Sequence, residues 1–168
     1  MSTKFADRQT DAFKGSPCVG RCSTVYGDSV CRGCKRFIHE ITQWNQYSNK
    51  QKELVWRRLE HIISTVVPRW VNIEYPDRLG EFLQHHAIRY DSHLPPTAWA
   101  LVCIEAFPYH LRELPKAGIR LKNEQLLRKD KQTVLEALQR ELYEVSLAYH
   151  QRQSQYLQSQ HLKEATGQ

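Results

Sequence analysis

The sequence has few of the residues that define fibrous proteins and no stretch suited to a membrane. Seven Gly and seven Pro in 168 residues exclude a collagen-like or Pro-rich fibre. No apolar run approaches the roughly 18 residues that a transmembrane helix requires. Residues 1–17 contain no apolar stretch of the kind found in signal peptides. We therefore expect a cytoplasmic protein that does not enter a membrane.

Catalytic motifs are also missing from the sequence. It contains no Gly-rich phosphate loop, no HExxH string and no GxSxG string. The carboxylates Glu105 and Glu113 stand apart from other candidate catalytic residues. The sequence therefore favours a non-enzymatic role, and an enzyme with a pocket in residues 66–120 is only a third hypothesis.

The positive charge is concentrated in the first third of the chain. The net charge is +6, and residues 1–62 hold 11 Lys and Arg against 6 Asp and Glu. This excess permits an acidic partner such as nucleic acid but does not require one. Nucleic acid is thus a possible partner, beside an unknown protein partner.

Four of the five cysteines lie within 17 residues, with the spacing C-x3-C-x8-C-x2-C: Cys18, Cys22, Cys31 and Cys34. In a reducing cytoplasm such clustering indicates a metal site rather than two disulfides. Gly20 and Gly33 lie inside the two cysteine pairs, where they permit tight turns. Four neighbouring cations should favour the thiolate form: Arg21, Arg32, Lys35 and Arg36.

The same four sulfurs could hold zinc in a closed structural site or an iron–sulfur cluster. The spacing matches neither of the usual ferredoxin patterns. On spacing alone, a short zinc knuckle is slightly favoured. The fifth cysteine, Cys103, lies in an apolar run, and we expect it in the core.

The string around the cysteines, SPC-x3-C-x8-C-x-G-C-K-R-x3-EI-x2-W, resembles a short bacterial family, the YdhL-like proteins (domain of unknown function 1289). The resemblance covers about residues 15–65, and Ser48, Arg57 and Arg58 fit the family's next segment. Phe37 departs from the small polar residue of the family. The matching residues are Ser16, Pro17, Cys18, Cys22, Cys31, Gly33, Cys34, Arg36, Glu40, Ile41 and Trp44.

This resemblance implies an iron–sulfur cluster, because members are labelled predicted iron–sulfur proteins. It implies no activity, since none is generally assigned to the family. Residues 66–168 look like the C-terminal extension of longer members.

Apolar spacing predicts a mainly α fold, in which a four-cysteine metal knuckle sits on a short helical hairpin. We expect a flexible leader over 1–15, a metal-binding module over 16–66 and a helical C-terminal region over 67–168. The first helix starts near Lys35, and the second runs from a Ser48/Gln51 capping box to Val66, with Pro68 ending it.

The C-terminal region should contain two further helices before a long one. We expect a short helix around Leu79, Phe82 and Leu83, and a buried helix over 97–107. A short extended piece is possible at 71–73. Residues 122–163 lack Gly and Pro, and their apolar stripe predicts one long helix or two collinear ones.

A possible interaction surface combines basic residues with one tryptophan: Lys35, Arg36, Lys50, Lys52, Trp56, Arg57 and Arg58. Trp44 fits the apolar face of the first helix and should be core, whereas Trp56 lies off its helix stripe.

Our first hypothesis is therefore a small metal-binding accessory protein with an electron-transfer or structural interaction role. The alternative is a zinc-knuckle module that binds nucleic acid or acts in regulation.

Overall fold

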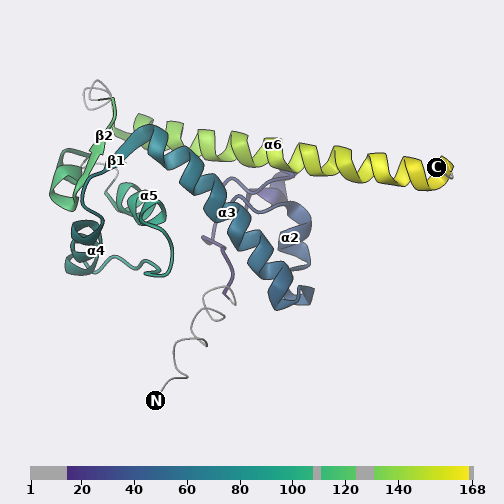
Figure 1. The fold of residues 1–168 in the computed structure, drawn as a ribbon, viewed down its shortest axis with the longest axis horizontal. Helices are drawn as coiled ribbons and strands as arrows, with labels where there is room; N and C mark the ends of the chain where they lie inside the picture. The colour runs from purple at the N-terminus through teal and green to yellow at the C-terminus, as the bar shows by residue number, and fades with distance from the viewer. Residues whose placement is uncertain (1–14, 108–110, 124–130, 167–168) are drawn as a thin grey trace, which may run out of the picture.

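The protein is mainly α-helical, as the sequence predicts, and its last helix is much the longest (Figure 1). The computed structural model describes residues 15–107, 111–123 and 131–166. The α-helices are α2 (Ile38–Thr42), α3 (Asn49–Trp70), α4 (Pro76–His85), α5 (Pro96–Ala106) and α6 (Lys131–Thr166). Short 3-10 helices are η1 (Ser23–Tyr26), η2 (Trp44–Gln46) and η3 (Leu111–Ala117), and the strands are β1 (Val71–Ile73) and β2 (Ile119–Leu121).

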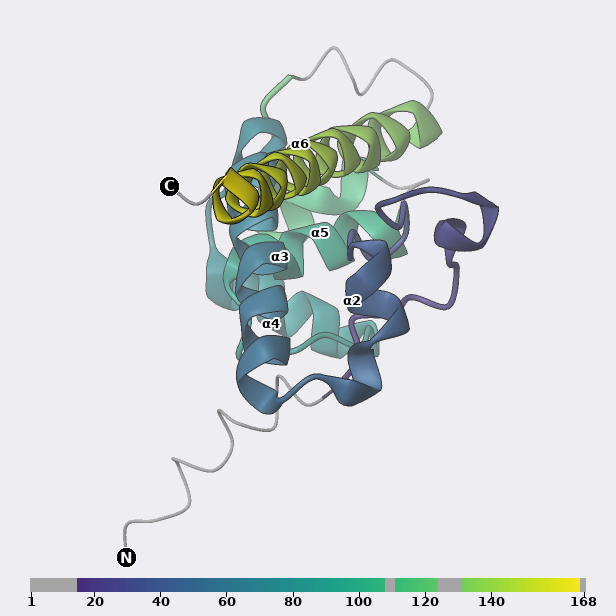
Figure 2. The same ribbon diagram turned by 90° about the vertical axis from the view of Figure 1, so that its right-hand side faces the viewer.

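The hydrophobic core lies where α3 packs against α5 and α6. Its fully buried side chains include Ile62 and Val66 of α3, Ile104 of α5 and Leu138 of α6. Figure 2 looks along α6 and shows α3 crossing it, with α2 beside α3. Cys103 is completely buried in this core, which confirms the expected packing role, and burial raises the pKa of its thiol to about 12.

Helix α3 begins as the sequence predicts and ends later. Ser48 is its N-cap, and Gln51 closes the capping box, with Ser48 N donating to Gln51 Oε1 at 2.9 Å. The predicted end at Pro68 is wrong, because α3 continues to Trp70. A proline lacks an N–H and its ring crowds the preceding turn, but here the N–H of Val71 still reaches the carbonyl of Val67 and closes the last turn.

The first helix is shorter than predicted. It starts after Phe37, whose N–H donates to Glu40 Oε2 at 2.9 Å, so Lys35 and Arg36 lie before the helix rather than in it. Beyond Thr42 the chain tightens into η2. Trp44 is only 7% exposed and packs with Val55 and Leu59 in a second small cluster, which confirms its core assignment.

The extended piece at 71–73 is confirmed as β1, and it pairs antiparallel with β2, which the sequence analysis did not predict. Both strands are three residues long, too short for an alternating pattern to stand out. Ile119 and Leu121 face the core, and Arg120 between them is exposed. The helices predicted around Leu79 and over 97–107 are present as α4 and α5.

Helix α6 is one continuous helix of 36 residues. Its described part begins at Lys131, whereas the sequence predicted a start at Lys122. Lys122 and Asn123 are not helical, and the predicted positions 124–130 lie outside the described residues. The predicted stripe is confirmed, because Val134, Leu138 and Leu142 are at most 2% exposed. The C-terminal part of α6 runs out beyond the other elements (Figure 1).

Helix α3 crosses the predicted module boundary at residue 66, and its last turns belong to the main core. In the described parts of the chain, no helix has the length and apolar character needed to span a bilayer.

Truncating Leu138 tests whether the α6 stripe is packed. Leu138→Ala should lower the free energy of unfolding by about 2–5 kcal/mol, since the side chain is 1% exposed. Leu157→Ala is the matched control on the same helix, because Leu157 is 49% exposed, and it should cost less than about 0.5 kcal/mol. Urea denaturation of both variants would measure this, and equal costs would contradict the packed stripe.

Candidate metal centre

The second cysteine pair lies on a tight turn at the end of a short antiparallel bridge. Val30 and Phe37 pair across this bridge. Cys31 N donates to the carbonyl of Arg36, and Lys35 N donates back to the carbonyl of Cys31, both at 2.8 Å. Lys35 adopts a left-handed conformation with φ of 60°, which lets the chain reverse after Cys34.

Cys31 and Cys34 are both buried and lie beside each other on this turn. Burial raises the pKa of Cys31, but hydrogen bonds from the backbone of Cys34, Ser23 and Gly33 and from the Cys34 thiol outweigh it, and the pKa falls to about 7. At Cys34 burial dominates and raises the pKa, although Arg36 acts in the opposite direction. The turn therefore favours one thiolate that is solvated by amide groups.

The first cysteine pair is brought against this turn by close backbone packing. A Cβ on Gly33 would lie 2.6 Å from the carbonyl oxygen of Arg21 and 2.8 Å from Val19 Cγ2, so only glycine fits here. Arg32 N also donates to Ser23 Oγ at 2.9 Å, and Cys31 Sγ lies 3.6 Å from the Arg21 carbonyl. The two halves of the motif are thus neighbours in space.

The four sulfurs are not gathered into one shell. Within the described residues, no three or more His, Cys, Asp or Glu side chains lie close enough to hold a metal ion. Cys18 is exposed and accepts a bond from Gly20 N at 3.4 Å, and half-buried Cys22 lies 2.9 Å from Thr24 Oγ1. The donor set fits a thiolate-bound metal in its chemistry, and closure requires Cys18 and Cys22 to turn toward the buried pair.

The basic residues after Cys34 are buried and hold the turn. The Lys35 ammonium donates to the carbonyls of Arg32, at 2.7 Å, and Gly33, at 3.1 Å. Arg36 Nε lies 3.4 Å from Cys34 Sγ, and its guanidinium stacks on Trp44 with 4.9 Å to the ring centroid. These two members of the predicted interaction surface therefore belong to the architecture of the turn.

Arg58 of α3 is a third cation in this region. Its guanidinium pairs with the buried carboxylate of Glu40 at 2.5 Å and lies 3.8 Å from the centroid of the Phe37 ring. It also reaches the carbonyl of Lys35 at 3.4 Å. Desolvation lowers the pKa of Arg58, and the charge of Glu40 opposes this shift. Arg58 thus ties α3 to the end of the cysteine turn.

The other members of the predicted surface lie along α3. Lys50 and Arg57 are exposed, and Arg57 pairs with Glu53 at 2.6 Å. Lys52 lies over the Trp44 ring at 5.7 Å. Trp56 is partly buried, and its indole N–H donates to the carbonyl of Gly15 at 3.2 Å.

The cysteine turn is attached to α6 through a polar relay that sequence reasoning missed. Lys35 Nζ donates to Gln139 Oε1, and Gln139 Nε2 donates to Glu105 Oε1 of α5. Desolvation lowers the pKa of Lys35, while the charges of Glu105, Cys31 and Cys34 oppose this shift. The one signal in the sequence was a polar residue, Gln139, directly after Leu138 of the predicted apolar stripe.

Two ring contacts add to this attachment. The Arg32 guanidinium lies over the Tyr143 ring at 4.6 Å, and Phe37 meets His150 edge-on with centroids 4.9 Å apart. Gln139, Tyr143 and His150 lie on one side of α6, three or more residues apart. The segment that carries the four cysteines, residues 16–37, is called the cysteine segment. It contacts α6 over about three turns.

Residues 16–62 match the family model described as "Protein of unknown function (DUF1289)". The match confirms the resemblance that the motif indicated, over nearly the same segment. No curated protein and no solved structure matches the chain.

Gly33 offers a direct test of the contact between the two cysteine pairs. Gly33→Ala should cost about 1–3 kcal/mol, because the new methyl group would overlap a backbone carbonyl that has to move. Gly15→Ala is the control, since a Cβ at Gly15 meets nothing within 4 Å. Thermal unfolding of both variants would measure the difference, and an unchanged Gly33→Ala midpoint would contradict this packing.

Proposed function

We propose that the protein is a metal-binding accessory protein, in which Cys18, Cys22, Cys31 and Cys34 hold an iron–sulfur cluster or, alternatively, zinc. When bound, zinc would supply structural cross-linking alone, and an iron–sulfur cluster would add one-electron redox chemistry. The cysteine segment then serves to fix the position of α6, whose end is available to a partner.

The observation that carries this proposal is the excess of buried positive charge beside the sulfurs. Lys35 and Arg36 are 7% and 3% exposed, and the buried carboxylate of Glu40 is already paired with Arg58. Glu105 offsets part of the charge of Lys35, and burying cations whose charge is only partly offset is costly. Four thiolates around Zn²⁺ carry a net charge of −2, so a bound centre would compensate Lys35 and Arg36.

The sulfurs also have the hydrogen-bond donors that metal thiolates need. Gly20 N points to Cys18 Sγ, backbone groups of the turn bond Cys31, and Arg36 Nε reaches Cys34 Sγ. Such donors orient ligands and stabilise their charge. Their presence at three of the four cysteines supports a metal role over free thiols.

The interaction role rests on the contacts with α6. Lys35, Arg32 and Phe37 each touch a different turn of that helix. A metal that holds the cysteine segment would therefore hold these three contacts as well. The nucleic-acid or regulatory alternative uses the same architecture and differs only in the partner.

The first experiment is metal analysis of anaerobically purified protein with its visible spectrum. Brown protein with acid-labile sulfide identifies the cluster, and colourless protein with one zinc per chain identifies the knuckle. Cys31→Ser should lose the metal, while Cys103→Ala should keep it, because Cys103 lies in the core away from the motif. Wild-type protein that stays metal-free after reconstitution with iron and sulfide, and also after reconstitution with zinc, would refute the proposal.

Loss of metal should loosen the cysteine segment selectively. Residues 16–34 contain few buried side chains and cannot offset their backbone entropy alone. In Cys31→Ser, amide hydrogen exchange should therefore accelerate over residues 15–45 and stay slow at Leu138 and Leu142 of α6. Unchanged protection over 15–45 would contradict a metal-supported fold.

Voltammetry separates electron transfer from a purely structural role. Zinc has no redox chemistry, so a zinc-loaded protein gives no wave, whereas a cluster gives a reversible one. Arg32→Gln removes an exposed positive charge near the turn and should lower the midpoint potential of a cluster. Absence of a wave in freshly prepared, metal-loaded wild type would reject electron transfer and leave the interaction role.

A further inference from the structure

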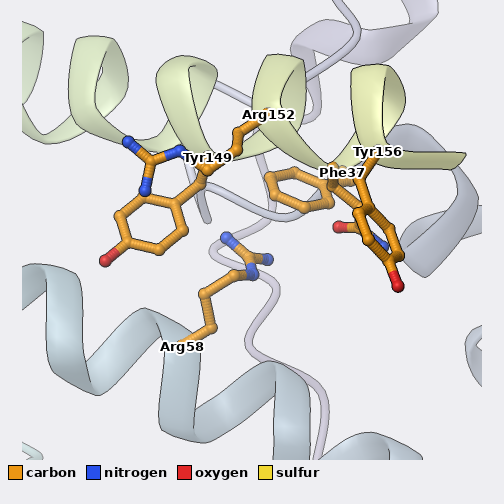
Figure 3. Close-up of a pocket in the computed structure, with 6 residues that line it drawn as sticks. Phe37, Arg58, Tyr149, Arg152 and Tyr156 are labelled. Carbon is orange, nitrogen blue, oxygen red and sulfur yellow. The ribbon is translucent and has the colours of Figure 1, made fainter. Parts of the chain in front are cut away.

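An aromatic groove lies between the cysteine segment, α3 and the projecting part of α6 (Figure 3). Its volume is about 300 Å³, and no carboxylate lines it. Six residues form its walls: Phe37, Arg58, Tyr149, Arg152, Gln153 and Tyr156. Three aromatic residues and two arginines line the groove, and of these Arg152 and Tyr156 are exposed.

The floor of the groove is held rigidly. Arg58 is fixed by its 2.5 Å pair with Glu40, so its planar guanidinium stays 3.8 Å from the centroid of the Phe37 ring. Phe37 is completely buried from solvent and meets His150 on α6. Phe37 therefore supports Arg58 from below, and the surface open to a flat group comes from the other lining residues of the groove.

The outer wall is exposed and positively charged. Tyr156 is 62% exposed, and Arg152 is exposed one helical turn before it. From Val145 to Lys163 the sequence of α6 contains no Asp or Glu. In Figure 3, Tyr149, Arg152 and Tyr156 extend from α6 on the side where Arg58 approaches from α3.

We infer that this groove binds single-stranded nucleic acid. Bases would stack on Tyr156 and Tyr149, and Arg152 would pair with the phosphate backbone. Aromatic faces and arginine planes accept any base, which is how sequence-tolerant single-strand sites work. An amphipathic peptide helix would instead need a row of aliphatic contacts, and the groove has none among its lining residues.

The inference deepens the proposed function by naming a partner. It rests on that function because one residue of the groove floor, Phe37, adjoins the cysteine turn. Phe37 is paired with Val30 across the bridge that carries the turn, so metal loss should disturb the floor of the groove. Arg152 and Tyr156 belong to α6 and do not depend on the metal for their fold.

The test is fluorescence anisotropy with a labelled oligo-dT of 12 nucleotides and the metal-loaded full chain. Tyr156→Ala should weaken binding about 5- to 150-fold, the usual effect of removing one stacking ring. Arg152→Gln should weaken it and reduce the slope of log K against log salt by about 0.7. Both side chains are exposed, so the variants should fold normally.

Matched controls are Tyr26→Ala, since Tyr26 is 89% exposed on η1, and Arg89→Gln, an exposed arginine between α4 and α5. Both should bind like wild type. The inference would be overturned if the control variants lost as much affinity for oligo-dT as the groove variants, or if the protein bound a duplex of the same length more tightly. Tighter binding to a Glu-rich peptide would also overturn it, in favour of a protein partner.

Metal content measured on the same samples separates the two proposals. A metal-loaded chain that does not bind oligo-dT overturns the groove inference and leaves the metal centre standing. A chain that never holds metal yet binds in a Tyr156-dependent way supports the groove and overturns the metal centre.

Discussion

The buried ammonium group of Lys35 is the contact on which the arrangement of the cysteine segment depends. It donates to two carbonyls of the cysteine turn and to Gln139 of α6, and Gln139 in turn bonds Glu105 of α5. One cation thus stabilises the turn internally and attaches it to two helices. A buried lysine is tolerable only with such a complete set of acceptors. Its left-handed backbone is part of the same arrangement, because the reversal after Cys34 directs the side chain back over the turn.

Local features of the fold could be read from the sequence with good accuracy. The Ser48/Gln51 box starts α3 where expected, because both partners of a capping box lie within four residues. The stripe of Val134, Leu138 and Leu142 indicated the long helix, because apolar residues that recur every four positions line one face of a helix. The prediction that Pro68 ends α3 was wrong, because a proline in the last turn costs one hydrogen bond and here does not stop the helix.

The contacts that build the candidate site were mostly beyond sequence reasoning. The motif predicted which cysteines matter, and the family match covers them. It could not show that Lys35 and Arg36 turn inward, since a run of basic residues usually marks a solvated face. The acceptor of the Lys35 ammonium, Gln139, lies 104 residues along the chain, and Gln139 in turn donates to Glu105. No periodic pattern links these residues. The place of Tyr156 in a groove was likewise not predictable, because the groove forms only where α3 and Phe37 lie beside α6.

The length of α6 has a mechanical consequence. The cysteine segment contacts this helix at Gln139, Tyr143 and His150, while the helix continues to Thr166. At about 1.5 Å per residue, roughly 24 Å of helix lies beyond His150. A tilt of the helix by about 10° at that point would displace its end by about 4 Å. The contacts at Gln139, Tyr143 and His150, together with the core, therefore set the direction in which the last turns of α6 extend.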